Sequence, residues 1–142
     1  MESIDFGGKP SDHTVSHDIP IACCDHYSKR VTELWFNVRH AIESGQMRGM
    51  SEDLVNEGAS REWGMVGNNK IEVEPKSEMK KKTGRSPDLF DALAAGLYGA
   101  IRLGFVIRRL TAPVSVKTDQ KWKQELRDKS REFWKAGQLV NA

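Results

Sequence analysis

The sequence predicts an α+β chain that is mostly helical and carries one or two short strands. Two amphipathic segments predict the helices, because apolar residues recur at three- and four-residue steps over residues 31–42 and 89–101. Alternation of apolar with acidic residues over residues 71–74 predicts a short strand. The length of 142 residues suits a single hydrophobic core, which we expect within residues 1–110.

The N-terminal segment, residues 1–27, shows no sustained periodicity and is punctuated by two glycines and Pro10. We expect an extended or loop segment there, with a short strand near Phe6. The first amphipathic helix follows over residues 31–42, and Gly45 is expected to end it.

Four short elements are predicted between the two long helices: a helix over about residues 51–62, a turn at 68–70, a strand at 71–74 and one or two helical turns at 76–82. Ser51 suits the N-cap of the first, since its hydroxyl can accept a hydrogen bond from a free backbone N–H group. Pro75 ends the strand, and Gly84 closes the helical turns.

The helix over residues 89–101 has the best-marked start. Ser86 can cap it, Pro87 suits the first helical position, and Asp88 suits the positive end of the helix dipole. The helix is expected to end around Gly104.

The apolar face of this helix is built at four-residue steps from Leu89, Leu93, Leu97 and Ile101. Gly96 and Gly99 weaken the helix in isolation. Because they have no side chain, we expect them to let a neighbouring element pack closely.

Residues 111–142 differ from the rest of the chain in composition, and we interpret them as a charged C-terminal helix or tail. The large apolar side chains of residues 119–136 are Trp122, Leu126, Phe133 and Trp134. These could dock the segment onto the preceding domain or bind another protein.

Asp88 and Asp91 lie three residues apart, so on a helix both carboxylates project from one face near its start. Metal-dependent cleavage of a phosphodiester uses carboxylates held together in this way, because charged oxygens bind Mg²⁺ or Mn²⁺ well. The alternative is an ordinary helix start, with Asp88 complementing the helix dipole and Asp91 solvated.

Positive charge is concentrated just before this pair. The formal net charge of +2 does not by itself indicate nucleic-acid binding. Residues 76–85, however, hold five cations and one anion: Lys76, Lys80, Lys81, Lys82 and Arg85 against Glu78. Such a run is either a contact surface for a phosphate backbone or simply a solvated face.

Other potential sites are weaker. A group of zinc-ligand side chains matches no established spacing: His13, His17, Cys23, Cys24 and His26. The two cysteines are adjacent, so we expect free thiols. Trp35, Phe36 and Trp63 are expected to be core or interface residues.

Four stretches, in this order, resemble the C-terminal half of the nuclease domain of a phage terminase large subunit: FGGKPSD (6–12), YSKRVTELWFNVRHAIESG (27–45), NNKIEVEPKSEMKKKTGRSPD (68–88) and LFDALA (89–94). The resemblance implies an RNase H-like fold that cuts concatemeric DNA during packaging, with Mg²⁺ or Mn²⁺ held by carboxylates. Two aspartates at the Asp88–Asp91 spacing also occur in RuvC-type resolvases.

The resemblance assigns roles to individual residues. Asp88 matches the last catalytic aspartate of the family, and Asp91 matches the neighbouring acidic position. A basic stretch expected to lie along DNA is matched by Lys80, Lys81, Lys82 and Arg85.

The family's first two catalytic acids lie on strands before the FGG segment, and its ATPase domain also precedes this region. We therefore expect a partial RNase H-like fold lacking its first strands, with weak or absent metal binding and no efficient endonuclease activity in the isolated chain.

The expected partners are double-stranded DNA and either the remainder of a terminase or a second copy of this chain. The alternatives are a small non-catalytic DNA-binding or adaptor protein, or a remnant with neither property. No apolar run suits a membrane span and no secretory leader is evident, so we expect no membrane partner and a location in the cytoplasm of a bacterial host.

Overall fold

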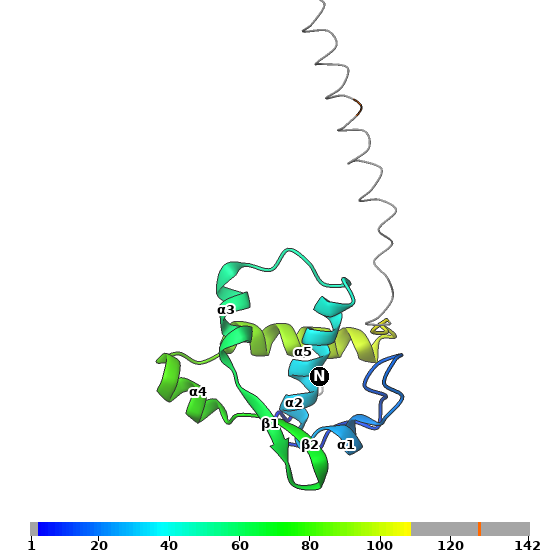
Figure 1. Ribbon diagram of the computed structural model, residues 1–142, viewed down its shortest axis with the longest axis horizontal. Helices are drawn as coiled ribbons and strands as arrows, with labels where there is room; N and C mark the ends of the chain where they lie inside the picture. Colours follow the sequence, from blue (N-terminus) through cyan, green and yellow to red (C-terminus); the bar gives the residue numbers. More distant parts are fainter. Residues whose placement is uncertain (1–2, 109–127, 129–142) are drawn as a thin grey trace, which may run out of the picture. The chain divides into compact units, whose positions relative to one another are not determined.

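Two helices, α2 (Arg30–Glu43) and α5 (Asp88–Arg102), cross at the centre of the fold (Figure 1). The computed structural model describes residues 3–108 and Asp128. Within these residues the architecture is α+β, with five α-helices and one two-stranded antiparallel sheet. The coarse fold class predicted from the sequence is therefore confirmed.

The chain divides into two compact units, Met1–Ala112 and Pro113–Ala142. Apart from Asp128, the second unit lies outside the described residues, and with it most of the helix or tail predicted for residues 111–142. No helix in the described part of the chain is long and apolar enough to cross a membrane.

The apolar face of α2 enters the hydrophobic core, as its periodicity predicts. Trp35 and Phe36 are 5 % and 6 % exposed, which confirms their predicted burial. The Trp35 ring packs against Phe90 of α5 with centroids 4.2 Å apart, and Phe36 packs against the fully buried Tyr27. The helix stops before Gly45, whose φ of +72° favours glycine and confirms the predicted stop.

The N-terminal loop covers the start of α2. The carbonyls of Phe6 and Gly8 accept hydrogen bonds from the first two backbone N–H groups of the helix, at 3.0 and 2.8 Å. Ser11 donates from its backbone N–H and its hydroxyl to the buried carboxylate of Glu33. The strand predicted near Phe6 is wrong, because this carbonyl bonds to a helix end rather than to a strand. The one-turn helix α1 (Cys23–His26) is an addition to the predicted loop.

The sheet is a hairpin of β1 (Trp63–Val66) and β2 (Lys70–Val73), in antiparallel register from the first residue of β1 with the last of β2. The short turn η1 (Gly67–Asn69) joins them. Asn68 and Asn69 have φ of 62° and 57°, a region that asparagine tolerates better than most residues. The predicted turn is confirmed, and the predicted strand is confirmed with a shift of one residue.

Helix α3 (Glu52–Ser60) is capped by Ser51, as predicted. The Ser51 hydroxyl accepts a hydrogen bond from the backbone N–H three residues on. The helix ends two residues earlier than predicted.

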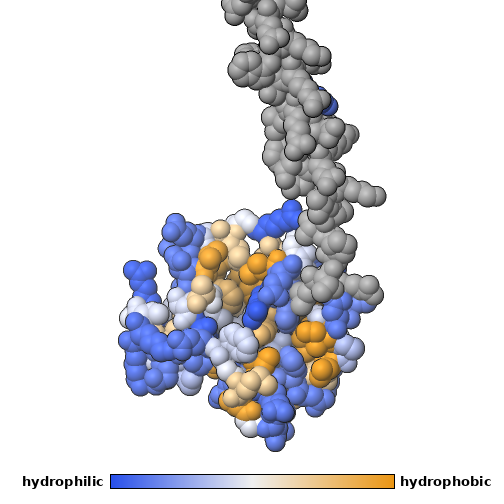
Figure 2. Space-filling model, viewed as in Figure 1, coloured by the Kyte–Doolittle hydropathy of each residue, from blue (hydrophilic) through white to orange (hydrophobic). Residues whose placement is uncertain are grey.

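The strand β1 was not predicted from the sequence. No buried alternation marks β1, since all four of its residues are exposed. Trp63 is 52 % exposed and so is not a core residue. Hydrophobic residues lie over the hairpin in Figure 2, whereas the surface of the α4 region is hydrophilic.

The helix α4 (Lys76–Thr83) ends as predicted at Gly84, which has a φ of +71°. The predicted capping of α5 by Ser86 is wrong. Pro87 occupies the N-cap position, no side chain caps the helix, and the N–H of Asp88 donates to the backbone carbonyl of Ser86 at 2.9 Å. The helix therefore begins one residue later than the Ser-Pro pattern indicates.

Close packing at a glycine occurs on α3 rather than on α5. A Cβ atom added at Gly96 or Gly99 would meet nothing within 4 Å among the described residues, so the predicted role of these glycines is wrong. At Gly58 the same atom would lie 2.3 Å from Cε2 of Phe90. The missing side chain at Gly58 therefore lets α3 lie against the first turn of α5.

We predict that Gly58→Ala lowers the free energy of unfolding by about 1–3 kcal/mol, because the new methyl group overlaps the Phe90 ring. Gly96→Ala is the matched control. It should be neutral or stabilising by up to about 1 kcal/mol, since alanine favours the helix and the position is open. Urea denaturation of the two variants measures the difference, and equal stabilities would contradict the packing argument.

Candidate functional site

The two aspartates at the start of α5 converge on one cation. The Lys76 Nζ atom lies 3.0 Å from Oδ1 of Asp88 and 3.1 Å from Oδ2 of Asp91. Lys76 is the first residue of α4, and the loop between α4 and α5 folds back so that the beginnings of the two helices meet. The hydrogen bond from Lys76 holds the pKa of Asp88 below its usual range.

The two carboxylates differ in their surroundings. The Asp88 side chain is 75 % exposed, whereas that of Asp91 is only 16 % exposed. Oδ1 of Asp91 accepts a hydrogen bond from Trp35 Nε1 at 2.8 Å, and the second oxygen faces Lys76. Asp91 is therefore the fixed member of the pair, and Asp88 is the member open to solvent.

Arg61, which directly follows α3, supports Asp91 from the side of the core. Its Nε donates to the carbonyl of Glu74 at 2.9 Å, and its guanidinium lies 4.5 Å from the centre of the Trp35 ring. Its Nη1 lies 3.8 Å from Oδ1 of Asp91 and has no hydrogen-bond partner among the described residues. Burial lowers the pKa of Arg61, and the nearby Asp91 opposes that shift.

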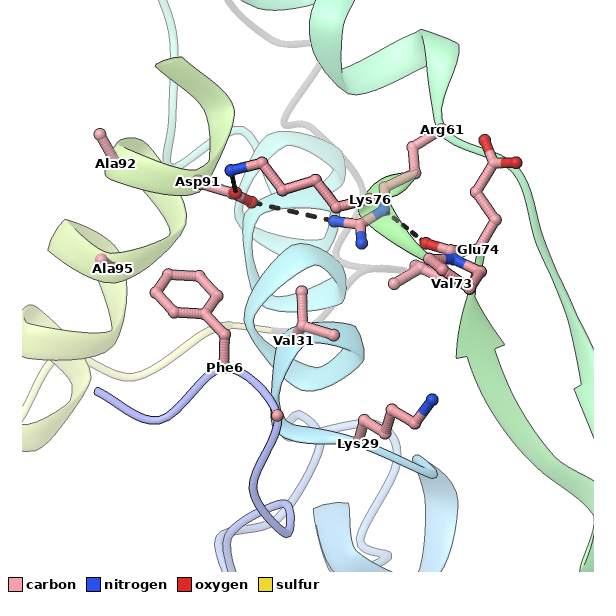
Figure 3. Close-up of a pocket in the computed structure, with 12 residues that line it drawn as sticks. Phe6, Lys29, Val31, Arg61, Val73, Glu74, Lys76, Asp91, Ala92 and Ala95 are labelled. Carbon is pink, nitrogen blue, oxygen red and sulfur yellow. Dashed lines mark hydrogen bonds and ion pairs between the residues drawn. The ribbon is translucent and has the colours of Figure 1, made fainter. Parts of the chain in front are cut away.

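These charged groups stand at one end of a cleft of about 600 Å³ (Figure 3). Its lining comes from the N-terminal loop, the start of α2, the link between α3 and β1, the end of β2 with the residues after it, α4 and α5: Phe6, Gly7, Lys29, Val31, Arg61, Val73, Glu74, Pro75, Lys76, Asp91, Ala92 and Ala95. In Figure 3 Phe6 lies toward Ala92 and Ala95 of α5, with Arg61 and Lys76 beside Asp91. The cleft thus has apolar walls, with Asp91, Lys76 and Arg61 together at one end and Lys29 apart from them.

The predicted DNA-contacting residues divide into two kinds. Lys81 pairs with Glu78 at 2.7 Å, and Lys82 lies 2.9 Å from both Glu62 and Glu74. Lys80 and Arg85 are exposed and form no salt bridge among the described residues. Within this basic stretch, Lys80 and Arg85 are therefore the cations least engaged by the protein itself.

Within residues 3–108, no three His, Cys, Asp or Glu side chains form a group that could hold a metal ion. The zinc-ligand types near the N-terminus are thus not assembled into a site. Cys23 and Cys24 are free thiols. The Asp88–Asp91 pair supplies two converging carboxylates, a donor set that suits a hard divalent cation but fills only part of its coordination shell.

The sequence predicted that the two aspartates lie on one helix face, but it did not predict that Trp35 and Arg61 contact Asp91. Trp35 lies on the apolar face of α2, and no sequence pattern indicates that its indole N–H donates a hydrogen bond. Arg61 follows the end of α3, and nothing in its local sequence indicates burial.

Comparison of the chain with protein-family models, with curated proteins and with solved structures gave no match. What the site can do is therefore inferred from its own residues: two carboxylates on a helix start, two cations that balance them, and an apolar cleft beside them.

We predict that Asp91→Ala destabilises the fold by roughly 2–3 kcal/mol, because Trp35 Nε1 loses its acceptor and the buried Arg61 loses a counter-ion. Asp88→Ala is the control, and its unfolding midpoint should match the wild type because the side chain is mostly exposed. Urea denaturation followed by tryptophan fluorescence checks both variants. Equal losses would show that Asp91 has no special structural role.

Proposed function

We propose that this chain is the C-terminal portion of a terminase-type nuclease domain with an RNase H-like ancestry. The observation that carries the proposal is the convergence of Asp88 and Asp91 on a single cation, at the helix start that the ordered sequence motifs mark. Asp88 is the first residue of α5 and lies one turn before Asp91, and this placement of the two carboxylates supports an inherited metal site. The setting would be genome packaging in the cytoplasm of a bacterial host.

The two aspartates would contribute unequally to a bound Mg²⁺ or Mn²⁺. Asp91 offers an oxygen whose position is fixed by Trp35 and Arg61, while Asp88 offers one on a mostly exposed side chain. Such an ion would polarise a DNA phosphate and activate a water molecule. Since divalent ions of this kind take about six ligands, further oxygens would come from water, from DNA and from the remaining acids of a complete nuclease domain.

The basic stretch would position DNA beside this pair. Lys80 and Arg85 are exposed and without salt bridges among the described residues, so their charge is available to phosphates. Lys82 already pairs with two glutamates and would contribute less.

A non-catalytic DNA-binding or adaptor protein derived from the same domain is the second candidate. Lys76 favours it, because its ammonium together with the Arg61 guanidinium already balances both aspartates without any metal ion. The same observation suits a nuclease domain that becomes active only when completed by the rest of a terminase or by a second copy of the chain.

We predict salt-dependent binding to a double-stranded oligonucleotide, measured by fluorescence anisotropy over a range of salt concentrations. Lys80→Gln and Arg85→Gln should each weaken binding and lower the salt slope by about one. Lys82→Gln should have a smaller effect, because its charge is already paired. Binding that is absent or independent of salt would contradict a DNA-binding role.

We further predict that the purified chain does not efficiently linearise supercoiled plasmid with Mn²⁺, since the two carboxylates bind a divalent ion weakly alone. Linearisation that stops on Asp88→Ala would overturn this expected inactivity. DNA affinity that needs no metal and survives Asp88→Ala would favour the non-catalytic candidate.

A further inference from the structure

The space between the two aspartates is filled by a side chain of the protein itself. One oxygen of each carboxylate accepts a hydrogen bond from the Lys76 ammonium, at 3.0 and 3.1 Å. A divalent ion held by both carboxylates would need the oxygens that Lys76 now engages. The ammonium and the ion therefore compete for the same ligands.

We propose that Lys76 is the resident cation of the Asp88–Asp91 pair and that a divalent metal ion binds by displacing it. The inference rests on the proposed function, because it concerns the same carboxylates. It adds a step that the aspartates alone do not imply, because metal binding is coupled to release of the Lys76 ammonium from the two carboxylates.

The position of Lys76 allows this release. Its side chain is 47 % exposed and is carried on a flexible four-carbon stem, so the ammonium can move into water without unfolding α4. The other cation of the site, Arg61, cannot leave in this way, since only 3 % of its side chain is exposed.

Asp91 keeps its place when Lys76 leaves. Its second oxygen remains hydrogen-bonded to Trp35 and close to Arg61, so the pair stays partly organised. When Lys76 leaves, the two carboxylates and Arg61 together carry a net charge of −1, which attracts a divalent ion. Lys76 and Arg61 together neutralise the pair in the metal-free state, and the departure of Lys76 restores negative charge to the site.

The strength of the competition follows from the exposure of Lys76 and Asp88, whose side chains are 47 % and 75 % exposed. Ion pairs of a cation with this much access to solvent contribute little free energy, so displacing Lys76 should weaken metal binding by roughly three- to tenfold rather than abolish it. The loss of Lys76 should therefore strengthen metal binding by the same factor.

The test measures binding of Mn²⁺ to the full chain by electron paramagnetic resonance, for wild type, Lys76→Gln and Lys81→Gln. The control removes the same charge from the same helix, but its ammonium bonds to Glu78 and contacts neither aspartate. We expect Lys76→Gln to bind Mn²⁺ three- to tenfold more tightly than wild type, and Lys81→Gln to stay within twofold. Circular dichroism establishes that the variants are folded.

A second readout follows the lysine itself. Acylation of amines, read by mass spectrometry, should be slow at Lys76 in the metal-free chain and at least severalfold faster with saturating Mn²⁺, while the rate at Lys81 stays constant. Faster modification of Lys76 together with tighter binding by Lys76→Gln supports displacement.

The outcomes separate this inference from the proposed function. Wild-type binding that needs Asp91 but is not strengthened by Lys76→Gln overturns the displacement alone. Absence of Mn²⁺ binding at millimolar concentration in both wild type and Lys76→Gln overturns the metal role of the aspartates, and the displacement with it.

Discussion

The carboxylate of Asp91 is the constraint on which the described fold depends most. It is mostly buried, and a charge in that position is stable only with partners. Trp35 of α2, Arg61 between α3 and β1, and Lys76 of α4 supply them. One side chain thereby joins the start of α5 to three other segments, and the geometry of the candidate site follows from the need to pair this carboxylate.

The sequence predicted well wherever local chemistry decides the structure. The 3.6-residue period marked both long helices, and Gly45 and Gly84 marked the ends of α2 and α4, where the backbone takes the left-handed conformation that favours glycine. It failed where distant contacts decide. The strand β1 is exposed throughout and exists by pairing with β2, so no period marks it. Gly58 needs its open space for a ring 32 positions away (58 to 90), and no local pattern indicates this.

The same division applies to the candidate site. The spacing of Asp88 and Asp91 was sufficient to place them on one helix face, since that is a local property. Which lysine reaches them was not predictable, because it depends on how the loop after α4 folds back. In the sequence, residues 76–85 form one basic run. In the structure, Lys76 pairs with the two aspartates and Lys82 pairs with two glutamates. Cations that are neighbours in the sequence therefore have different partners in the fold.

The short helix α1 places its two neighbouring cysteines in different environments. Cys23 is 1 % exposed, and burial raises the pKa of its thiol to about 12. Cys24 is only partly covered, and a hydrogen bond with Asp12 raises the pKa of its thiol as well. The two sulfurs therefore differ in access, since an alkylating reagent meets a closed sulfur at Cys23 and an accessible one at Cys24. A fluorophore or spin label would therefore attach at Cys24, giving a single reporter on α1 without any cysteine having to be removed.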